Sequence, residues 1–116
     1  MSKKILLIDD ESNVRLLYKE ELEDEGYIVY VAKDAKEGFE KFKKFNPDLV
    51  ILDIKMPEIS GIEALQKFKR LKGSIPVILL TAFGEYQYEF TTWAADEYII
   101  KSSNMEKLKD TVKKYL

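Results

Sequence analysis

The chain has 116 residues, a length that suits one domain with its own core and is too short for two. Its 19 basic and 21 acidic residues give a net charge of −2, which argues against direct binding to nucleic acid. The sequence contains no cysteine and no histidine, which excludes disulfides, thiolate metal sites and any histidine nucleophile of its own. The first apolar stretch is too short for a signal peptide or a membrane span, so we expect a cytoplasmic protein without membrane contact.

Strand-like and helix-like patterns alternate along the chain. In chain order they predict a strand at 5–8, a helix at 12–25, a strand at 27–31, a helix at 35–45, a strand at 49–52, a helix at 60–71, a strand at 77–80, a helix that includes Phe83, Phe90 and Trp93, a strand at 98–100 and a last helix from about 105 to 115. In the first helix, the residues expected to face the core are Val14, Leu17, Tyr18 and Leu22.

This alternation predicts an α/β fold, a parallel sheet with helices on both faces. The strands are continuous apolar runs, as a sheet buried on both faces requires. Right-handed crossovers restrict the topology to a few doubly wound strand orders. In the order 2-1-3-4-5 the first and third strands are neighbours, and ligands bind beyond the carboxyl ends of the strands at that point.

Acidic residues follow these two strands. Asp9, Asp10 and Glu11 come directly after the first strand, and Asp53 follows the third. Taken singly, Asp10 would be explained as a helix N-cap and Asp53 as a turn residue. At adjacent strand ends, however, Asp9, Asp10 and Asp53 would share one cleft, where like charges require a cation. Oxygen donors without histidine or cysteine select a hard ion, and Mg²⁺ fits them.

Two more polar side chains follow strands that end at the same edge. Thr81 comes after the fourth strand and Lys101 after the fifth. Taken singly, Thr81 would be a strand-end cap and Lys101 a solvated charge. Together with the carboxylates and Mg²⁺, a hydroxyl and an ammonium describe a site for a phosphoryl group.

The stretches LLIDDE, LVILDIKMPEISGIEAL, VILLTAFG and YIIK resemble, in order and spacing, the receiver domain of response regulators in two-component signalling. DIKMP and TAFGE are most similar to single-domain receivers such as those of chemotaxis and the sporulation phosphorelay. The resemblance covers nearly the whole chain, so we expect residues 1–116 to be a single receiver domain. It implies a flavodoxin-like three-layer sandwich with strand order 2-1-3-4-5.

The resemblance also implies a mechanism. Asp53 would accept a phosphoryl group from the phosphohistidine of a sensor histidine kinase or a histidine phosphotransfer protein. Mg²⁺ would be bound by Asp10, Asp53 and the backbone carbonyl of Lys55, with Asp9 acting through water. Lys101 would pair with the phosphoryl oxygens. Beyond its own phosphoryl transfer and dephosphorylation, no enzymatic activity is expected.

A coupled switch and an output surface follow from the same resemblance. Thr81 would hydrogen-bond the phosphoryl group, and Tyr98 would rotate inward behind it. A downstream protein would bind the face formed by residues 84–116. The aromatic side chains Phe83, Tyr86, Phe90 and Trp93 are spaced as one helical face and would be explained as a core stripe. Alternatively, Tyr88, which lies off that stripe, would belong to a docking or homodimer surface.

Two features are particular to this sequence. Ser102 follows Lys101 where the family usually has proline, and the segment from Thr81 to Lys101 is short for the family, which predicts a shortened fourth helix. Lys55 and Phe83 lie two residues after Asp53 and Thr81, at positions that line the path of hydrolytic water in receivers. A long cation and a bulky ring predict slow self-dephosphorylation.

Two other classes of protein share part of this pattern. A phosphatase of the haloacid-dehalogenase type also combines Asp, Thr, Lys and Mg²⁺, but its D-x-D-x-T/V nucleophile motif is absent from DDES and the chain leaves no room for a cap. A receiver-like binding module that works without phosphorylation is the alternative, favoured by the change after Lys101.

Overall fold

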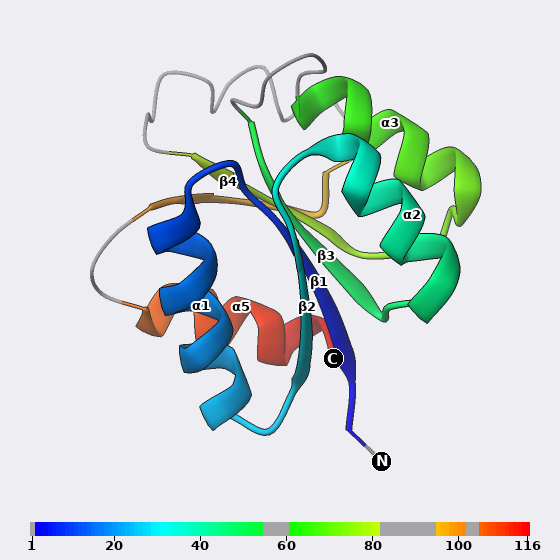
Figure 1. Ribbon diagram of the computed structural model, residues 1–116. Helices are drawn as coiled ribbons and strands as arrows, with labels where there is room; N and C mark the ends of the chain where they lie inside the picture. Colours follow the sequence, from blue (N-terminus) through cyan, green and yellow to red (C-terminus); the bar gives the residue numbers. More distant parts are fainter. Residues whose placement is uncertain (1, 55–60, 82–94, 102–104) are drawn as a thin grey trace.

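The computed structural model describes residues 2–54, 61–81, 95–101 and 105–116, with only the backbone of 61 and 62 (Figure 1). The strands are β1 (Lys4–Ile8), β2 (Ile28–Ala32), β3 (Leu49–Asp53), β4 (Val77–Thr81) and β5 (Glu97–Ile100). The helices in the described residues are α1 (Ser12–Asp24), α2 (Ala35–Phe45), α3 (Gly61–Leu71) and α5 (Glu106–Tyr115). The predicted helix with Phe83, Phe90 and Trp93 lies outside the described residues, as do Lys55 and Ser102.

All five strands pair in parallel, in the order β2-β1-β3-β4-β5. β1 and β3 are therefore direct neighbours, with Leu6 opposite Val50. Helices α1 and α5 cover one face of the sheet and α2 and α3 the other, which gives three layers (Figure 1). The predicted α/β class and strand order are confirmed.

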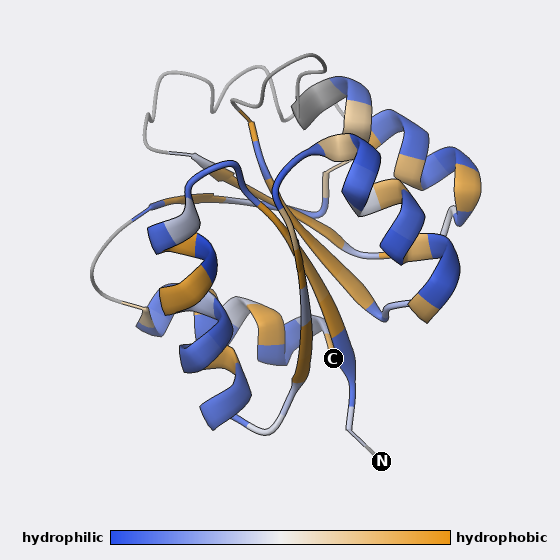
Figure 2. Ribbon diagram, viewed as in Figure 1, coloured by the Kyte–Doolittle hydropathy of each residue, from blue (hydrophilic) through white to orange (hydrophobic). Residues whose placement is uncertain are grey.

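Alternate residues of each central strand enter two separate cores. In β1, Leu6 and Ile8 belong to the core beneath α2 and α3, whereas Ile5 and Leu7 belong to the core beneath α1 and α5. Both sets are buried, so the central strands are apolar at successive positions between their ends, whereas the helices are apolar on one side only (Figure 2). This pattern leaves the strand ends as the places where polar side chains can gather.

The boundaries of α2 follow from local chemistry. The Asp34 side chain accepts a hydrogen bond from the Glu37 amide at 2.9 Å, a typical N-cap. Asn46 ends the helix in the left-handed region, with φ of 49°, and Pro47 follows. The predicted helix at 35–45 is confirmed. Gly26 ends the turn after α1 with φ of 97°, a conformation that favours glycine.

One predicted core residue of α1 is wrong. Tyr18 and Leu22 are buried and Val14 packs at the edge of the same core, but Leu17 is 44% exposed. The three inward residues are spaced four apart, so α1 touches the sheet through a narrow stripe. Leu17 lies beside this stripe, next to the still more exposed Leu16.

The open edge of β2 is covered by lysines. Ile28 and Ala32 bond to the β1 side through the Ile28 amide and the Ala32 carbonyl, so the alternate carbonyls of Val29 and Val31 face outward. Lys19 of α1 donates to the Val29 carbonyl and Lys41 of α2 donates to the Val31 carbonyl. Two helices on opposite faces therefore satisfy the acceptors that an incoming strand would use.

Within the residues that the structure describes, no helix is long and apolar enough to cross a lipid bilayer.

Candidate functional site

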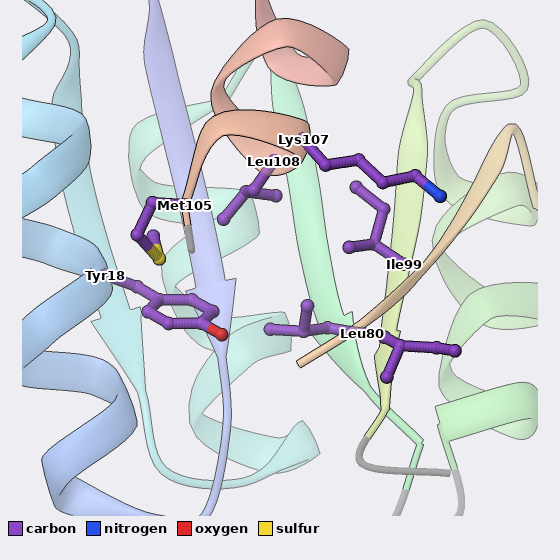
Figure 3. Close-up of a pocket in the computed structure, with 7 residues that line it drawn as sticks. Tyr18, Leu80, Ile99, Met105, Lys107 and Leu108 are labelled. Atoms are coloured by element: carbon purple, nitrogen blue, oxygen red, sulfur yellow. The ribbon is translucent and has the colours of Figure 1, made fainter. Parts of the chain in front are cut away.

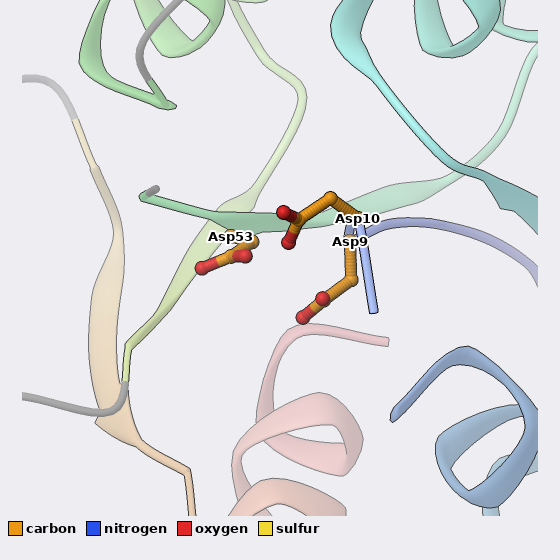
Figure 4. Close-up of side chains that lie close together, drawn as sticks. All are labelled: Asp9, Asp10 and Asp53. Atoms are coloured by element: carbon orange, nitrogen blue, oxygen red, sulfur yellow. The ribbon is translucent and has the colours of Figure 1, made fainter. Parts of the chain in front are cut away.

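Three aspartates meet at the carboxyl ends of β1 and β3. One carboxylate oxygen from each of Asp9, Asp10 and Asp53 lies within 4.8 Å of the others (Figure 4). Asp9 is fully buried and Asp53 is 4% exposed, whereas Asp10 is exposed. The structure thus brings together the three acids that sequence reasoning assigned to one cleft. Their donor set, three hard oxygen ligands, fits Mg²⁺.

The turn after β1 explains how Asp9 and Asp10 differ. The Asp9 amide donates to the Ala32 carbonyl at 3.1 Å, and Asp9 Oδ1 accepts from the Glu11 amide at 2.9 Å. Helix α1 begins at Ser12 with Glu11 at the N-cap, so Asp10 is not the cap that its position alone suggests. Asp9 therefore holds the turn, while Asp10 remains exposed to solvent.

Lys101, directly after β5, brings a cation to these acids. Its Nζ lies 2.9 Å from Asp9 Oδ2, 3.3 Å from Glu11 Oε1 and 3.5 Å from Asp53 Oδ2. The lysine side chain is only 13% exposed. No role was predicted for Glu11, although it is the third acid of the run after β1, and that run was the available signal.

Burial and charge oppose each other in this cluster. Burial raises the pKa of Asp9, and its hydrogen bonds with Lys101 and the Glu11 amide only partly offset that rise. Burial by itself would lower the pKa of Lys101, but the bond to Asp9 and the charges of Asp9, Asp53 and Glu11 outweigh it and raise that pKa above its usual range. Lys101 is thus charged at neutral pH and faces an excess of carboxylates. This imbalance favours the binding of a further cation.

Thr81 and Tyr98 occupy the strands next to the acids. Thr81, at the end of β4, is buried, and its carbonyl accepts a hydrogen bond from the Lys101 amide. Tyr98 lies in β5 opposite Leu79 and packs against the core beneath α2 and α3. Thr81 therefore lies at the same edge of the sheet as the aspartates. Lys55 and Phe83, predicted to tune hydrolysis, lie outside the described residues.

A separate cavity of about 170 Å³ lies on the α1 and α5 side of the sheet (Figure 3). Its lining is mainly apolar, and the residues are Tyr18, Leu80, Ile99, Ile100, Met105, Lys107 and Leu108. None of these described residues carries a carboxylate, so this cavity does not suit a metal ion. The chemistry belongs to the strand-end cluster.

A parallel 2-1-3-4-5 sheet with an acidic cluster and a lysine at its carboxyl edge is the architecture of a phosphoryl-accepting switch domain. The family model described as response regulator receiver domain matches residues 5–113. The chain belongs to the response regulator receiver domain family, as its motifs predicted. It is therefore a signalling switch of the two-component or phosphorelay type, in which histidine kinases are the partners of receivers.

Among curated proteins, the chain is 36% identical over 118 residues to sporulation initiation phosphotransferase F of Bacillus subtilis, covering all of this chain and 95% of that protein. It is also 35% identical over 121 residues to the alkaline phosphatase synthesis transcriptional regulatory protein PhoP of the same species. All of this chain is covered in that match, but only 49% of PhoP. The chain thus spans nearly the full length of one relative and about half of the other.

Solved structures agree with the fold. Response regulator TrrA from Thermotoga maritima, in complex with Mg²⁺ and BeF, is 49% identical with a TM-score of 0.93, covering 98% of this chain and 99% of that one. TrrA in complex with the histidine kinase ThkA is similar at 49% identity and a TM-score of 0.91, with 98% of each chain covered. The cofactor expected from the carboxylates, Mg²⁺, is thus the ion bound in a similar receiver.

Proposed function

We propose that Asp53 accepts a phosphoryl group from the phosphohistidine of a sensor histidine kinase or a histidine phosphotransfer protein. The observation that carries this proposal is the position of Asp53: buried, in a cluster of three carboxylates, with Lys101 Nζ 3.5 Å from its Oδ2. The similar TrrA was solved with its kinase ThkA, and a similar Bacillus protein is named a phosphotransferase, which supports this class of donor.

The transfer is a displacement at phosphorus. A carboxylate oxygen of Asp53 forms the new P–O bond, the P–N bond to the donor imidazole breaks, and the imidazole leaves with the electron pair as neutral histidine once protonated. This chain has no histidine, so it can accept from such a donor but cannot be one. The product is an aspartyl phosphate at the edge of the sheet.

Mg²⁺ would neutralise negative charge on the phosphoryl oxygens and on the acids during this transfer. Asp10 and Asp53 would hold it directly, together with the backbone carbonyl of Lys55, and Asp9 through water. The convergence of three carboxylate oxygens within 4.8 Å supports the first two ligands and Asp9. Lys101, held among the acids, would donate to the phosphoryl oxygens.

The response to phosphorylation would pass through β4 and β5. Thr81 would hydrogen-bond the phosphoryl group, and Tyr98, partly buried two positions before the exposed end of β5, would move inward. The output surface would be residues 84–116, where a downstream protein binds and where a homodimer is a second use. Lys55 and Phe83 would obstruct the attacking water, so that self-dephosphorylation is slow.

We extend the proposal to the chain as a whole. Residues 1–116 would form a single receiver domain that works in the cytoplasm, touches neither membrane nor nucleic acid, and catalyses only its own phosphoryl transfer and dephosphorylation. The alternative is a receiver-like binding module that works without phosphorylation.

Intact-protein mass spectrometry separates these two functions. The protein is incubated with acetyl phosphate with and without Mg²⁺, and in parallel with a phosphorylated histidine kinase. We expect one added phosphoryl group that requires Mg²⁺, is lost in Asp53→Asn and is kept in Asp24→Asn, an exposed aspartate at the end of α1. An adduct that persists in Asp53→Asn would assign the acceptor elsewhere. A folded protein with no adduct from either donor would contradict the proposal and leave the binding module as the alternative.

A further inference from the structure

We propose that Glu11 competes with the phosphoryl group for Lys101 and thereby weakens the phosphorylated state of the site. The inference rests on the proposed function, because it concerns the same lysine. It assigns a regulatory role to a residue that lies beside the acidic cluster and outside the three carboxylates grouped there as metal ligands.

Three carboxylates already surround the Lys101 ammonium group. An ammonium group carries three N–H donors, and three carboxylates surround Lys101 Nζ, at 2.9 Å (Asp9), 3.3 Å (Glu11) and 3.5 Å (Asp53). A phosphoryl group on Asp53 adds new anionic oxygens that need the same lysine. One of the existing partners must therefore give way.

The three partners differ in what happens when they lose the lysine. Asp9 is fully buried, so losing its cation would leave an uncompensated charge in the interior. Asp53 carries the incoming group itself. The Glu11 side chain is 61% exposed and can exchange the ammonium for water. Glu11 is thus the partner that leaves, and its pair with Lys101 must be broken when the phosphoryl group arrives.

The position of Glu11 allows its side-chain charge to be changed without removing a cap of α1. Its amide is tied to Asp9 Oδ1 at 2.9 Å, but its side chain makes no capping hydrogen bond to α1. Glu11→Gln therefore removes the charge without removing a helix cap. Glu11→Asp keeps the charge but is one methylene shorter, too short for the present contact with Lys101. Glu20→Gln removes an exposed charge of α1 outside the Lys101 cluster and is the matched control.

The experiment is calorimetric titration with beryllofluoride, a phosphoryl mimic, at saturating Mg²⁺. Each variant's affinity for Mg²⁺ alone is measured first, so that saturation is assured. An exposed ion pair contributes little, so we expect Glu11→Gln and Glu11→Asp to bind beryllofluoride about 1.4- to 5-fold more tightly than the unmodified protein. Glu20→Gln should bind as the unmodified protein does.

Two results would overturn the inference. If Glu11→Asp binds like the unmodified protein, only the local negative charge matters and the contact does not. If Glu11→Gln binds like Glu20→Gln, Glu11 has no effect on the site at all. Failure of the unmodified protein to bind beryllofluoride with Mg²⁺ is a different result, because it would contradict the proposed function itself.

Discussion

Replacing Lys101 by methionine should destabilise the protein, and Mg²⁺ should restore part of the loss. Methionine keeps much of the length and apolar character of the lysine stem but removes the charge. Asp9 and Asp53, both buried, would then lie in a cluster of carboxylates without the ammonium 2.9 and 3.5 Å away. Like charges held together in a poorly hydrated site repel each other and resist ionisation.

The magnitude follows from the burial of the pair. Removing one partner of a buried ion pair costs about 3–5 kcal/mol, and we expect about 3 kcal/mol here because proton uptake by Asp9 relieves part of the strain. The direction of the Asp9 pKa, already raised by burial, indicates which carboxyl takes up that proton. The matched control is Lys114→Met, whose side chain is 66% exposed and pairs with Glu97 at 3.2 Å, and which should lose far less stability because an exposed ion pair contributes little.

Urea unfolding at neutral pH, followed by circular dichroism with and without Mg²⁺, measures both effects. A ligand that binds only the folded state stabilises it. Because Lys101→Met lacks the positive charge among the carboxylates, Mg²⁺ should increase its free energy of unfolding more than that of the unmodified protein. The reasoning would be refuted if Lys101→Met lost no more stability than Lys114→Met in the absence of Mg²⁺. A Mg²⁺-induced gain equal in Lys101→Met and the unmodified protein would separately refute the electrostatic account of the cluster.

Three further predictions test the packing of the elements that position the site. A Cβ at Gly38 would lie 2.4 Å from Ile8 Cδ1, so Gly38→Ala should lower the free energy of unfolding by about 1–2 kcal/mol. The loss should be smaller in an Ile8→Val background, which lacks this methyl group, and equal losses in both backgrounds would contradict the clash. Phe68 is fully buried, with its ring centroid 4.8 Å from that of Phe39. Phe68→Ala should therefore lower the free energy of unfolding by about 3–5 kcal/mol in thermal unfolding, whereas Leu71→Ala, at an exposed site, should lower it by less than about 1 kcal/mol. The double variant Lys19→Met/Lys41→Met should expose the β2 edge and show concentration-dependent self-association in sedimentation velocity. The double variant Lys36→Met/Lys43→Met makes the same change of charge at exposed sites on α2 and should sediment like the unmodified protein.

The fold could be predicted from the sequence because its signals are local. An apolar run such as Leu49–Leu52 followed by Asp53 indicates a strand buried on both faces whose end is polar, wherever the strand lies in the sheet. Asp34 and Asn46 mark the ends of α2 through bonds to their own neighbours in the chain. The grouping of Asp9, Asp10 and Asp53 followed from the same signals once the strand order was known.

Other features depended on contacts between distant segments. Leu17 has the same apolar character as Leu22, and only the narrow contact of α1 with the sheet decides that Leu17 is exposed and Leu22 buried. Lys101 and Glu11 are 90 positions apart, and their contact exists because the end of β5 reaches the turn after β1. No local pattern encodes such a meeting.

The amino-acid sequence by itself therefore determined the type and order of the elements and the chemical character of the strand ends. The tertiary structure alone decided how charge is shared there: Asp9 is the buried partner of Lys101, Glu11 is its exposed partner, and Asp10 is exposed to solvent. The physical reason is that periodicity and capping act over a few residues, whereas burial and ion pairing depend on which strand ends the packed sheet brings within a few ångströms of one another.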